Sequence, residues 1–280
     1  MMCYFKTSKE ILGFLNKTNK SIGLVPTMGA LHAGHESLIK KALIENEIVI
    51  VSIFVNPTQF ENKNDLINYP KNIDNDIEKI KNLDPQIIIY NPNINDIYNN
   101  KLNVKNFDFG FIGSELEGHF RKNHFNSVAT IVEKLFNLFK PNRAYFGEKD
   151  YQQILIIKSL KIKSNLDVEI ISCPIIRDND GLALSSRNSL LTKKERKIAP
   201  IIHKSLLDVK NKIKSNQKIE SIIFKIQNEF KSISPLKLEY LEIREALSLK
   251  KVNKINSQKK YRAFIAARIG KIRLIDNIEL

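Results

Sequence analysis

The stretch SIGLVPTMGALHAGHESLIKKALIEN, residues 21–46, joins a short apolar strand to an amphipathic helix through a turn that contains two glycines and two histidines. Gly29 and Gly34 allow a ligand to approach the backbone closely because they lack a Cβ atom. The helix begins close to His35, so its backbone N–H groups and the positive end of its dipole face the space above the strand. The stretch therefore predicts a strand–turn–helix unit of an α/β fold with an anion site at the turn.

The alternation of strand and helix continues along the chain as far as about Cys173. The expected strands are residues 21–26, 47–56, 84–92, 143–147 and 168–172, and the expected helices include 35–46, 72–83, 127–139 and one from about 150. This alternation is typical of a parallel sheet covered by helices on both faces. We expect a Rossmann-like domain over residues 1–173.

The pattern changes after Cys173. Residues 174–192 contain a DNDG turn and the polar sequence SSRN, which predict a loop, and two helices follow. Three strands are then expected at residues 236–245, 261–269 and 271–280, with Gly270 at the turn between the last two. We expect residues 174–280 to form a smaller α+β lid domain that carries the SSRN loop.

Composition excludes several classes of protein. The N-terminus has no apolar run of signal-peptide length, no segment is apolar enough for a membrane span, and Cys3 and Cys173 are expected as unbridged thiols, so the predicted location is cytoplasmic. The net charge is +15, from 45 Lys and Arg against 30 Asp and Glu, but the basic residues are scattered along the chain. This distribution argues against a nucleic-acid partner and favours a site for anions.

Three roles are open for His32 and His35. Zinc ligation is possible for an HxxH pair, but the third ligand and the adjacent glutamate of a zinc hydrolase are missing. A structural role is the ordinary alternative for any single histidine. We favour charge stabilisation, because imidazoles beside a phosphate chain can donate hydrogen bonds to a departing pyrophosphate.

Four sequence blocks carry a resemblance to a known family. PTMGALHAGHESL resembles the HxGH signature of the nucleotidylyltransferase superfamily, and in this longer form it resembles the pantothenate synthetase family. VSIFVNPTQF (51–60), KPNRAYFGEKDYQQ (140–153) and DGLALSSRN (180–188) follow in the family's order. The resemblance implies that ATP activates (R)-pantoate as pantoyl adenylate with release of pyrophosphate, and that the amine of β-alanine then displaces AMP to give pantothenate.

The resemblance also implies the roles of individual residues. The implied ATP-binding residues are Met28, Gly29, Ala30, Leu31, His32, Ala33, Gly34, His35, Gly147, Glu148, Lys149, Asp150, Ile176, Leu184, Ser185, Ser186 and Arg187. The catalytic, charge-handling set is His32, His35, Lys149, Ser185, Ser186 and Arg187. Gln59, Gln153 and Asn56 are expected to bind pantoate, and Gln59 also to bind β-alanine. Mg²⁺ is expected to arrive with ATP, no protein ligand for a metal is identified, and a homodimer is expected.

One segment departs from the family pattern. Where the family usually shows RPGHFRGV, this chain has RKNHFNSV at residues 121–128, which keeps Arg121, His124 and Phe125 but lacks the Pro-Gly pair, the second arginine and the second glycine. We expect activity to survive, because the nucleotide and pantoate blocks are intact. Two alternatives stay open at this point: a nucleotidylyltransferase that leaves the nucleotide on its product, and a basic module that binds nucleic acid.

Overall fold

A computed structural model describes residues 3–15, 19–60, 63–99 and 101–280. The chain divides into two compact units, of which the first comprises Met1–Glu148 and Gln152–Pro174. The second comprises Lys149–Tyr151 and Ile175–Leu280. The domain boundary expected after Cys173 thus lies beside the end of the first unit at Pro174.

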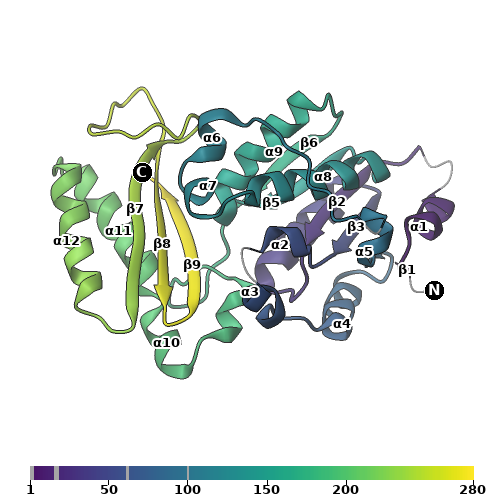
Figure 1. The fold of residues 1–280 in the computed structure, drawn as a ribbon, viewed down its shortest axis with the longest axis horizontal. Helices are drawn as coiled ribbons and strands as arrows, with labels where there is room; N and C mark the ends of the chain where they lie inside the picture. Colours follow the sequence, from purple (N-terminus) through teal and green to yellow (C-terminus); the bar gives the residue numbers. More distant parts are fainter. Residues whose placement is uncertain (1–2, 16–18, 61–62, 100) are drawn as a thin grey trace. The chain divides into compact units, whose positions relative to one another are not determined.

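The first unit is built on a parallel sheet (Figure 1). In the described part of the chain its strands are β1 (Tyr4–Phe5), β2 (Ile22–Thr27), β3 (Ile48–Ile53), β4 (Ile88–Tyr90), β5 (Arg143–Gly147) and β6 (Glu169–Cys173). Their spatial order is β1-β4-β3-β2-β5-β6, and every pairing is parallel. The chain moves outward from β2 through β3 to β4 and then returns to the other side of β2 at β5. The carboxyl ends of β2 and β5 therefore form the switch point at which open α/β sheets bind ligands.

Helices cover both faces of this sheet. The helices described before the second unit's loop are α1 (Ser8–Leu15), α2 (Ala33–Glu45), α3 (Lys63–Asn68), α4 (Ile73–Leu83), α5 (Ile94–Tyr98), α6 (Gly110–Ser114), α7 (Glu117–Phe120), α8 (His124–Phe139) and α9 (Tyr151–Lys163). Successive strand residues enter two different cores, since Leu24 packs with side chains of α8 and α9 whereas Val25 packs with side chains of α2 and α4. This alternation follows from the opposite directions of neighbouring side chains in a strand. The predicted Rossmann-like parallel sheet is confirmed.

The second unit contains an antiparallel sheet with helices on one face. After the 3₁₀ helix η3 (Ser186–Leu190) come α10 (Lys193–Ile198), α11 (Ile201–Lys214) and α12 (Ile219–Lys231), followed by β7 (Leu236–Glu245), β8 (Tyr261–Ile269) and β9 (Ile272–Glu279). The strand order is β7-β8-β9, and α11 and α12 pack against the sheet (Figure 1). The three C-terminal strands and the α+β class predicted for this part are confirmed.

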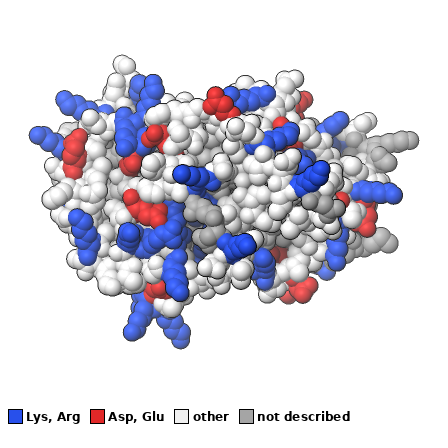
Figure 2. All heavy atoms as spheres, in the orientation of Figure 1, with Lys and Arg blue, Asp and Glu red and all other residues white. Residues whose placement is uncertain are grey.

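The charges of the surface are mixed. Figure 2 shows Lys and Arg side chains over much of the face drawn, with Asp and Glu side chains among them. Within residues 3–15, 19–60, 63–99 and 101–280, no helix has both the length and the apolar character needed to cross a membrane.

Candidate active site

The two histidines of the turn cap helix α2. His32 is the N-cap residue, and its Nδ1 accepts a hydrogen bond from the Gly34 N–H at 3.1 Å. Nδ1 of His35 accepts in turn from the His32 N–H at 3.4 Å, so the two imidazoles form a reciprocal capping box. The structural role and the chemical role predicted for these residues are therefore compatible, because the cap uses only one nitrogen of each ring.

This cap determines where the imidazole protons lie. A backbone N–H can only donate, so Nδ1 of each neutral ring is an acceptor and Nε2 carries the proton. The ring centroids of His32 and His35 are 4.1 Å apart. Two Nε2–H donors thus originate at one helix N-terminus, where the helix dipole already favours negative charge. The turn has the chemistry of an anion site.

The backbone of the same turn is held by helix α4. The Ala30 and Leu31 N–H groups donate to the Asp76 carboxylate at 2.8 and 2.7 Å. Contacts between ATP and these two N–H groups would have to compete with that carboxylate, and the ATP-binding roles of Ala30 and Leu31 stay predictions. Sequence reasoning overlooked Asp76, which lies 46 residues after Ala30 in an ordinary amphipathic helix.

The FVNPTQF block forms a supported 3₁₀ turn at the carboxyl end of β3. Helix η1 spans Pro57–Gln59, and the side chain of Asn56 is its N-cap. Asn56 is only 1% exposed, its Oδ1 accepts from the Tyr98 hydroxyl at 2.9 Å, and its Nδ2 donates to the Ser127 carbonyl at 3.4 Å. The amide of Asn56 is thus engaged inside the protein, and its predicted contact with pantoate stays a prediction.

The divergent RKNHFNSV segment supports this turn. Arg121 Nη2 and His124 Nδ1 both donate to the backbone carbonyl of Gln59, at 3.3 and 3.2 Å. Ser127 Oγ donates to the Thr58 carbonyl at 2.7 Å. Two residues that the segment shares with the family pattern, Arg121 and His124, therefore position the residue predicted to bind both pantoate and β-alanine.

The EKDYQQ block follows β5 at the switch point. The 3₁₀ helix η2 (Glu148–Asp150) contains Lys149, whose side chain is 19% exposed, with Nζ at 3.6 Å from the Asp150 carboxylate. The Lys149 carbonyl accepts from Asn277 Nδ2 at 2.9 Å, and both residues belong to the second unit. Gln153 is partly buried and belongs to the first unit.

Gln152 has a structural role that sequence reasoning missed. Its Oε1 accepts from the Glu117 N–H at 3.0 Å, and its Nε2 donates to the carbonyls of Ile112 and Glu115. Gln152 therefore fixes the backbone between α6 and α7. The spacing of four residues from buried Ile156 could have indicated that this glutamine faces the core.

The SSRN loop contains Ser185, Ser186 and Arg187, which are predicted from the sequence to bind ATP. Ser185 caps η3, its Oγ accepting from the Arg187 N–H at 3.3 Å, and the Ile176 carbonyl accepts from the Leu184 N–H at 2.9 Å. Ser185, Ser186 and Arg187 thus lie together on one short turn, as their spacing predicts. Hydroxyls and a guanidinium in this arrangement suit phosphate oxygens.

Ion pairs anchor the start of this loop. Arg196 pairs with Asp180 at 2.5 Å and with Asp178 at 2.7 Å, and it holds the pKa of both carboxyls below the usual range. Arg177 makes a 2.6 Å pair with buried Asp276 of β9. The DNDG turn is therefore attached both to α10 and to the sheet of the second unit.

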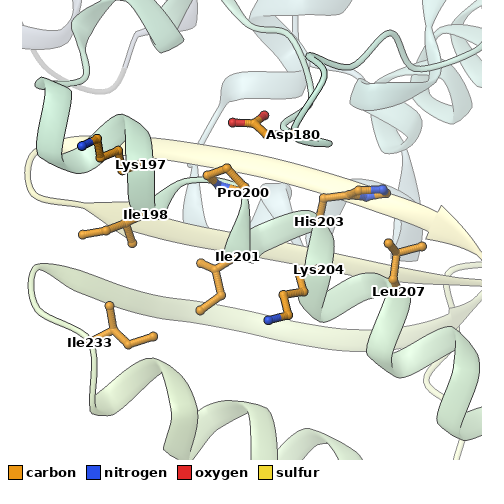
Figure 3. Close-up of a pocket in the computed structure, with 9 residues that line it drawn as sticks. All are labelled: Asp180, Lys197, Ile198, Pro200, Ile201, His203, Lys204, Leu207 and Ile233. Atoms are coloured by element: carbon orange, nitrogen blue, oxygen red, sulfur yellow. The ribbon is translucent and has the colours of Figure 1, made fainter.

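A cavity of about 530 Å³ lies in the second unit beside that anchor (Figure 3). Asp180 of the DNDG turn and Lys197, Ile201 and His203 are among its lining residues. Gly181 has φ +90°, and a Cβ there would lie 2.7 Å from the ring of His203, so the turn packs directly on α11. Burial lowers the pKa of His203. Among the described residues, none of the predicted site residues lines this cavity.

The donors of the turn at β2 do not suit a metal ion. Backbone N–H groups and imidazole Nε2–H groups bind anions, whereas Mg²⁺ requires oxygen ligands. Across the described ranges, no group of three or more His, Cys, Asp and Glu side chains is placed to hold a metal.

Known proteins are similar to this chain over almost its whole length. The family model described as pantoate-beta-alanine ligase matches residues 4–279. A pantothenate synthetase of Christiangramia forsetii is 50% identical over 261 residues, 93% of this chain and 92% of that protein. A pantothenate synthetase of Flavobacterium psychrophilum is 43% identical over 282 residues and covers 100% of both chains.

Two solved structures are similar over almost the whole chain. Pantothenate synthetase from Thermus thermophilus gives a TM-score of 0.92 at 32% identity, with 99% of each chain covered. Pantoate-beta-alanine ligase from Francisella tularensis, solved as a complex with beta-gamma ATP and beta-alanine, gives a TM-score of 0.84 at 39% identity, with 100% of this chain and 98% of that chain covered. The chain belongs to the pantoate–β-alanine ligase family.

Proposed function

We propose that this protein condenses (R)-pantoate with β-alanine at the expense of ATP, giving pantothenate, AMP and pyrophosphate. The observation that carries the proposal is the histidine-capped turn at the sheet's switch point, in a chain that matches this ligase family from residue 4 to residue 279. Relatives that cover the full length of the chain are named for the same activity.

In the first step, a carboxylate oxygen of pantoate attacks the α-phosphorus of ATP. A new P–O bond forms, the bond to the bridging oxygen breaks, and negative charge grows on the departing pyrophosphate. The Nε2–H groups of His32 and His35 and the N-terminus of α2 stabilise that charge. Lys149, Ser185, Ser186 and Arg187 are proposed as further partners of the phosphates.

In the second step, the amine of β-alanine attacks the acyl carbon of pantoyl adenylate. The C–N bond forms, AMP leaves with the electrons of the C–O bond, and the amine loses a proton. No covalent bond to the enzyme is required, so the protein acts mainly by positioning its substrates and neutralising charge.

Side chains with amide groups are proposed to bind pantoate, the acid substrate. We propose that Gln59, Gln153 and Asn56 orient pantoate and that Gln59 also contacts β-alanine. Support comes from the rigid setting of η1, whose backbone is held by Arg121, His124 and Ser127.

ATP would be contacted by the residues of the two glycine-containing turns and the SSRN loop. The proposed ATP-binding residues are Met28–His35, Gly147–Asp150, Ile176 and Leu184–Arg187. Mg²⁺ is proposed to enter as the complex of ATP, held by phosphate oxygens. A homodimeric state and a cytoplasmic location complete the proposal.

The test is isotope exchange between pyrophosphate and ATP. The purified protein should catalyse exchange only when pantoate is present, and the addition of β-alanine should then release AMP and pantothenate. Absence of pantoate-dependent exchange would overturn the proposal. Exchange without AMP release would instead indicate an enzyme that leaves the nucleotide on its product.

A further inference from the structure

The turn between β2 and α2 holds one non-glycine residue, Ala30, in a backbone conformation that its side chain disfavours. Gly29 has φ +81° and Ala30 has φ +51°. Glycine adopts such angles without difficulty, but the left-handed region brings the Cβ of alanine too close to the following carbonyl oxygen. Non-glycine residues persist in this region only where their surroundings hold them there.

The surroundings are supplied by helix α4. Asp76 is 1% exposed and divides its carboxylate between two consecutive amides, with Oδ2 at 2.8 Å from the Ala30 nitrogen and Oδ1 at 2.7 Å from the Leu31 nitrogen. Lys79, one turn further along α4, donates from Nζ to the Leu31 carbonyl at 2.5 Å. Two side chains of one helix therefore bind both the N–H and the C=O sides of the same turn.

The fit at Gly29 is equally close. A Cβ at this position would lie 3.0 Å from Asp76 Oδ2, so the space left by the glycine is occupied by the carboxylate. Consecutive N–H groups in such a turn form a concavity that binds anions. In this turn the anion is the Asp76 carboxylate, which accepts hydrogen bonds from the Ala30 and Leu31 amides.

We propose that Asp76, assisted by Lys79, is a positioning residue for adenylate formation. By holding Gly29 and Ala30 in the left-handed conformation, Asp76 sets the direction in which His32 and His35 present their Nε2–H donors to the phosphates. The inference rests on the proposed function, since positioning has a meaning only if the turn serves a phosphate-displacing reaction.

Burial raises the pKa of the Asp76 carboxyl, and the hydrogen bonds from the Leu31 and Ala30 amides and the charge of Lys79 oppose that shift. The two hydrogen bonds to consecutive amides, at 2.7 and 2.8 Å, fix the geometry of the turn.

The decisive variant is Asp76→Asn, which keeps the shape of the side chain but turns an NH₂ group toward one of the two amides. Pantoate-dependent pyrophosphate exchange should fall by at least about tenfold in kcat, with the KM values for ATP and pantoate changed by less than about threefold. Hydrogen exchange of a peptide covering residues 27–34 should become faster. The midpoint of thermal unfolding should stay within about 4 °C of the unchanged protein.

A matched control and a rescue variant separate positioning from general damage. Asp74→Asn makes the same chemical change at an exposed position of the same helix and should leave exchange activity within about twofold. Adding Ala30→Gly to Asp76→Asn removes the strain of the left-handed residue, so the double variant should recover at least about threefold of the lost kcat.

Each outcome has a defined meaning. If the unchanged protein shows no pantoate-dependent exchange, the proposed function fails, while the hydrogen-exchange comparison still decides whether Asp76 holds the turn. If Asp76→Asn leaves the exchange of peptide 27–34 unaltered and the activity within about twofold, the positioning role is overturned. A loss of activity that only mirrors a lowered unfolding midpoint, with no recovery by Ala30→Gly, also overturns it.

Discussion

At the scale of single residues, each of the two histidines combines an observed structural role with a proposed chemical one. Nδ1 of His32 and Nδ1 of His35 close the capping box of α2, while Nε2–H is the donor that we propose for a phosphate oxygen. A structural role and a chemical role therefore do not exclude each other in these histidines, because each role uses a different nitrogen of the ring.

The two functions of His32 can be separated by substitution. Asparagine is among the best N-cap residues, so His32→Asn should keep the stability of the protein within about 1 kcal/mol. The variant lacks the Nε2–H donor, and the rate of pyrophosphate exchange should fall by about 100-fold. His32→Ala should lose both the cap and the activity. Normal exchange by His32→Asn would remove the charge-stabilising role, and urea unfolding of both variants provides the stability comparison.

The cationic residues of the proposed phosphate site give a second prediction at this scale. Lys149→Ala and Arg187→Ala should each lower the rate of pyrophosphate exchange by at least about 100-fold, the size of effect expected for loss of a preorganised charge partner. Lys158→Ala, at an exposed position of α9, is the control and should have little effect. A loss below tenfold in a folded Lys149→Ala or Arg187→Ala protein would contradict the role of that residue.

At the scale of elements, the site depends on which helices support which loops. The turn η1 contains Gln59 but is held by α5 through Tyr98, by Arg121 at the end of α7, and by the start of α8 through His124 and Ser127. Support of this kind comes from residues that have no contact with a substrate in the proposed mechanism.

The support of η1 by α5 leads to a third prediction. Tyr98→Phe removes the hydroxyl that donates to Asn56 Oδ1 at 2.9 Å in a buried environment, which should cost about 1 kcal/mol of unfolding free energy. Because η1 is loosened, the KM for pantoate should rise while the KM for ATP stays the same. Tyr240→Phe, a buried tyrosine of β7, is the matched control. An equal rise in both KM values would show general damage and contradict the specific link to η1.

The elements that could be predicted from the sequence are marked by a local pattern of apolar residues. Those that were missed are too short for such a pattern or depend on residues far away in the chain. The strands that become β2 to β9 and the helices that become α2, α4, α8 and α9 carry local periodicity, and all of them are observed. Strand β1 spans only Tyr4–Phe5, too short for any periodic signal. The α6–α7 segment owes its backbone fixation to Gln152 from α9.

The same distinction applies to the candidate site. The residues of the histidine turn are neighbours in sequence, as are Ser185–Arg187, so the helix N-terminus of the first and the loop of the second could be predicted; the 3₁₀ helix within that loop was not. Asp76 acts on a turn 46 residues before it, and a short polar side chain in an amphipathic helix has no local feature that distinguishes this role. Residues that support a site from a distant part of the sequence can therefore be recognised only in the folded structure.

At the scale of the whole molecule, titration of buried groups links stability to pH. Cys173, the last residue of β6, is 2% exposed, and burial raises the pKa of its thiol from 9.0 to about 11. Burial also raises the pKa of Tyr90, Tyr98 and Tyr145. Each of these groups favours the folded state while it is protonated, so stability should fall when the solution becomes alkaline.

The contribution of Cys173 can be isolated by comparing the unchanged protein with Cys173→Ala. Between pH 9 and pH 11 the folded thiol keeps its proton while the unfolded thiol loses it, so the unfolded state binds fewer protons and stability decreases as pH rises. The cavity left by alanine lowers stability by an amount that does not depend on pH, and the tyrosines act equally in both proteins. The difference in unfolding free energy between the two proteins should therefore shrink by about 1 kcal/mol between pH 8 and pH 10. Urea unfolding at a series of pH values measures this difference, and parallel curves for the two proteins would show that Cys173 does not titrate with a raised pKa.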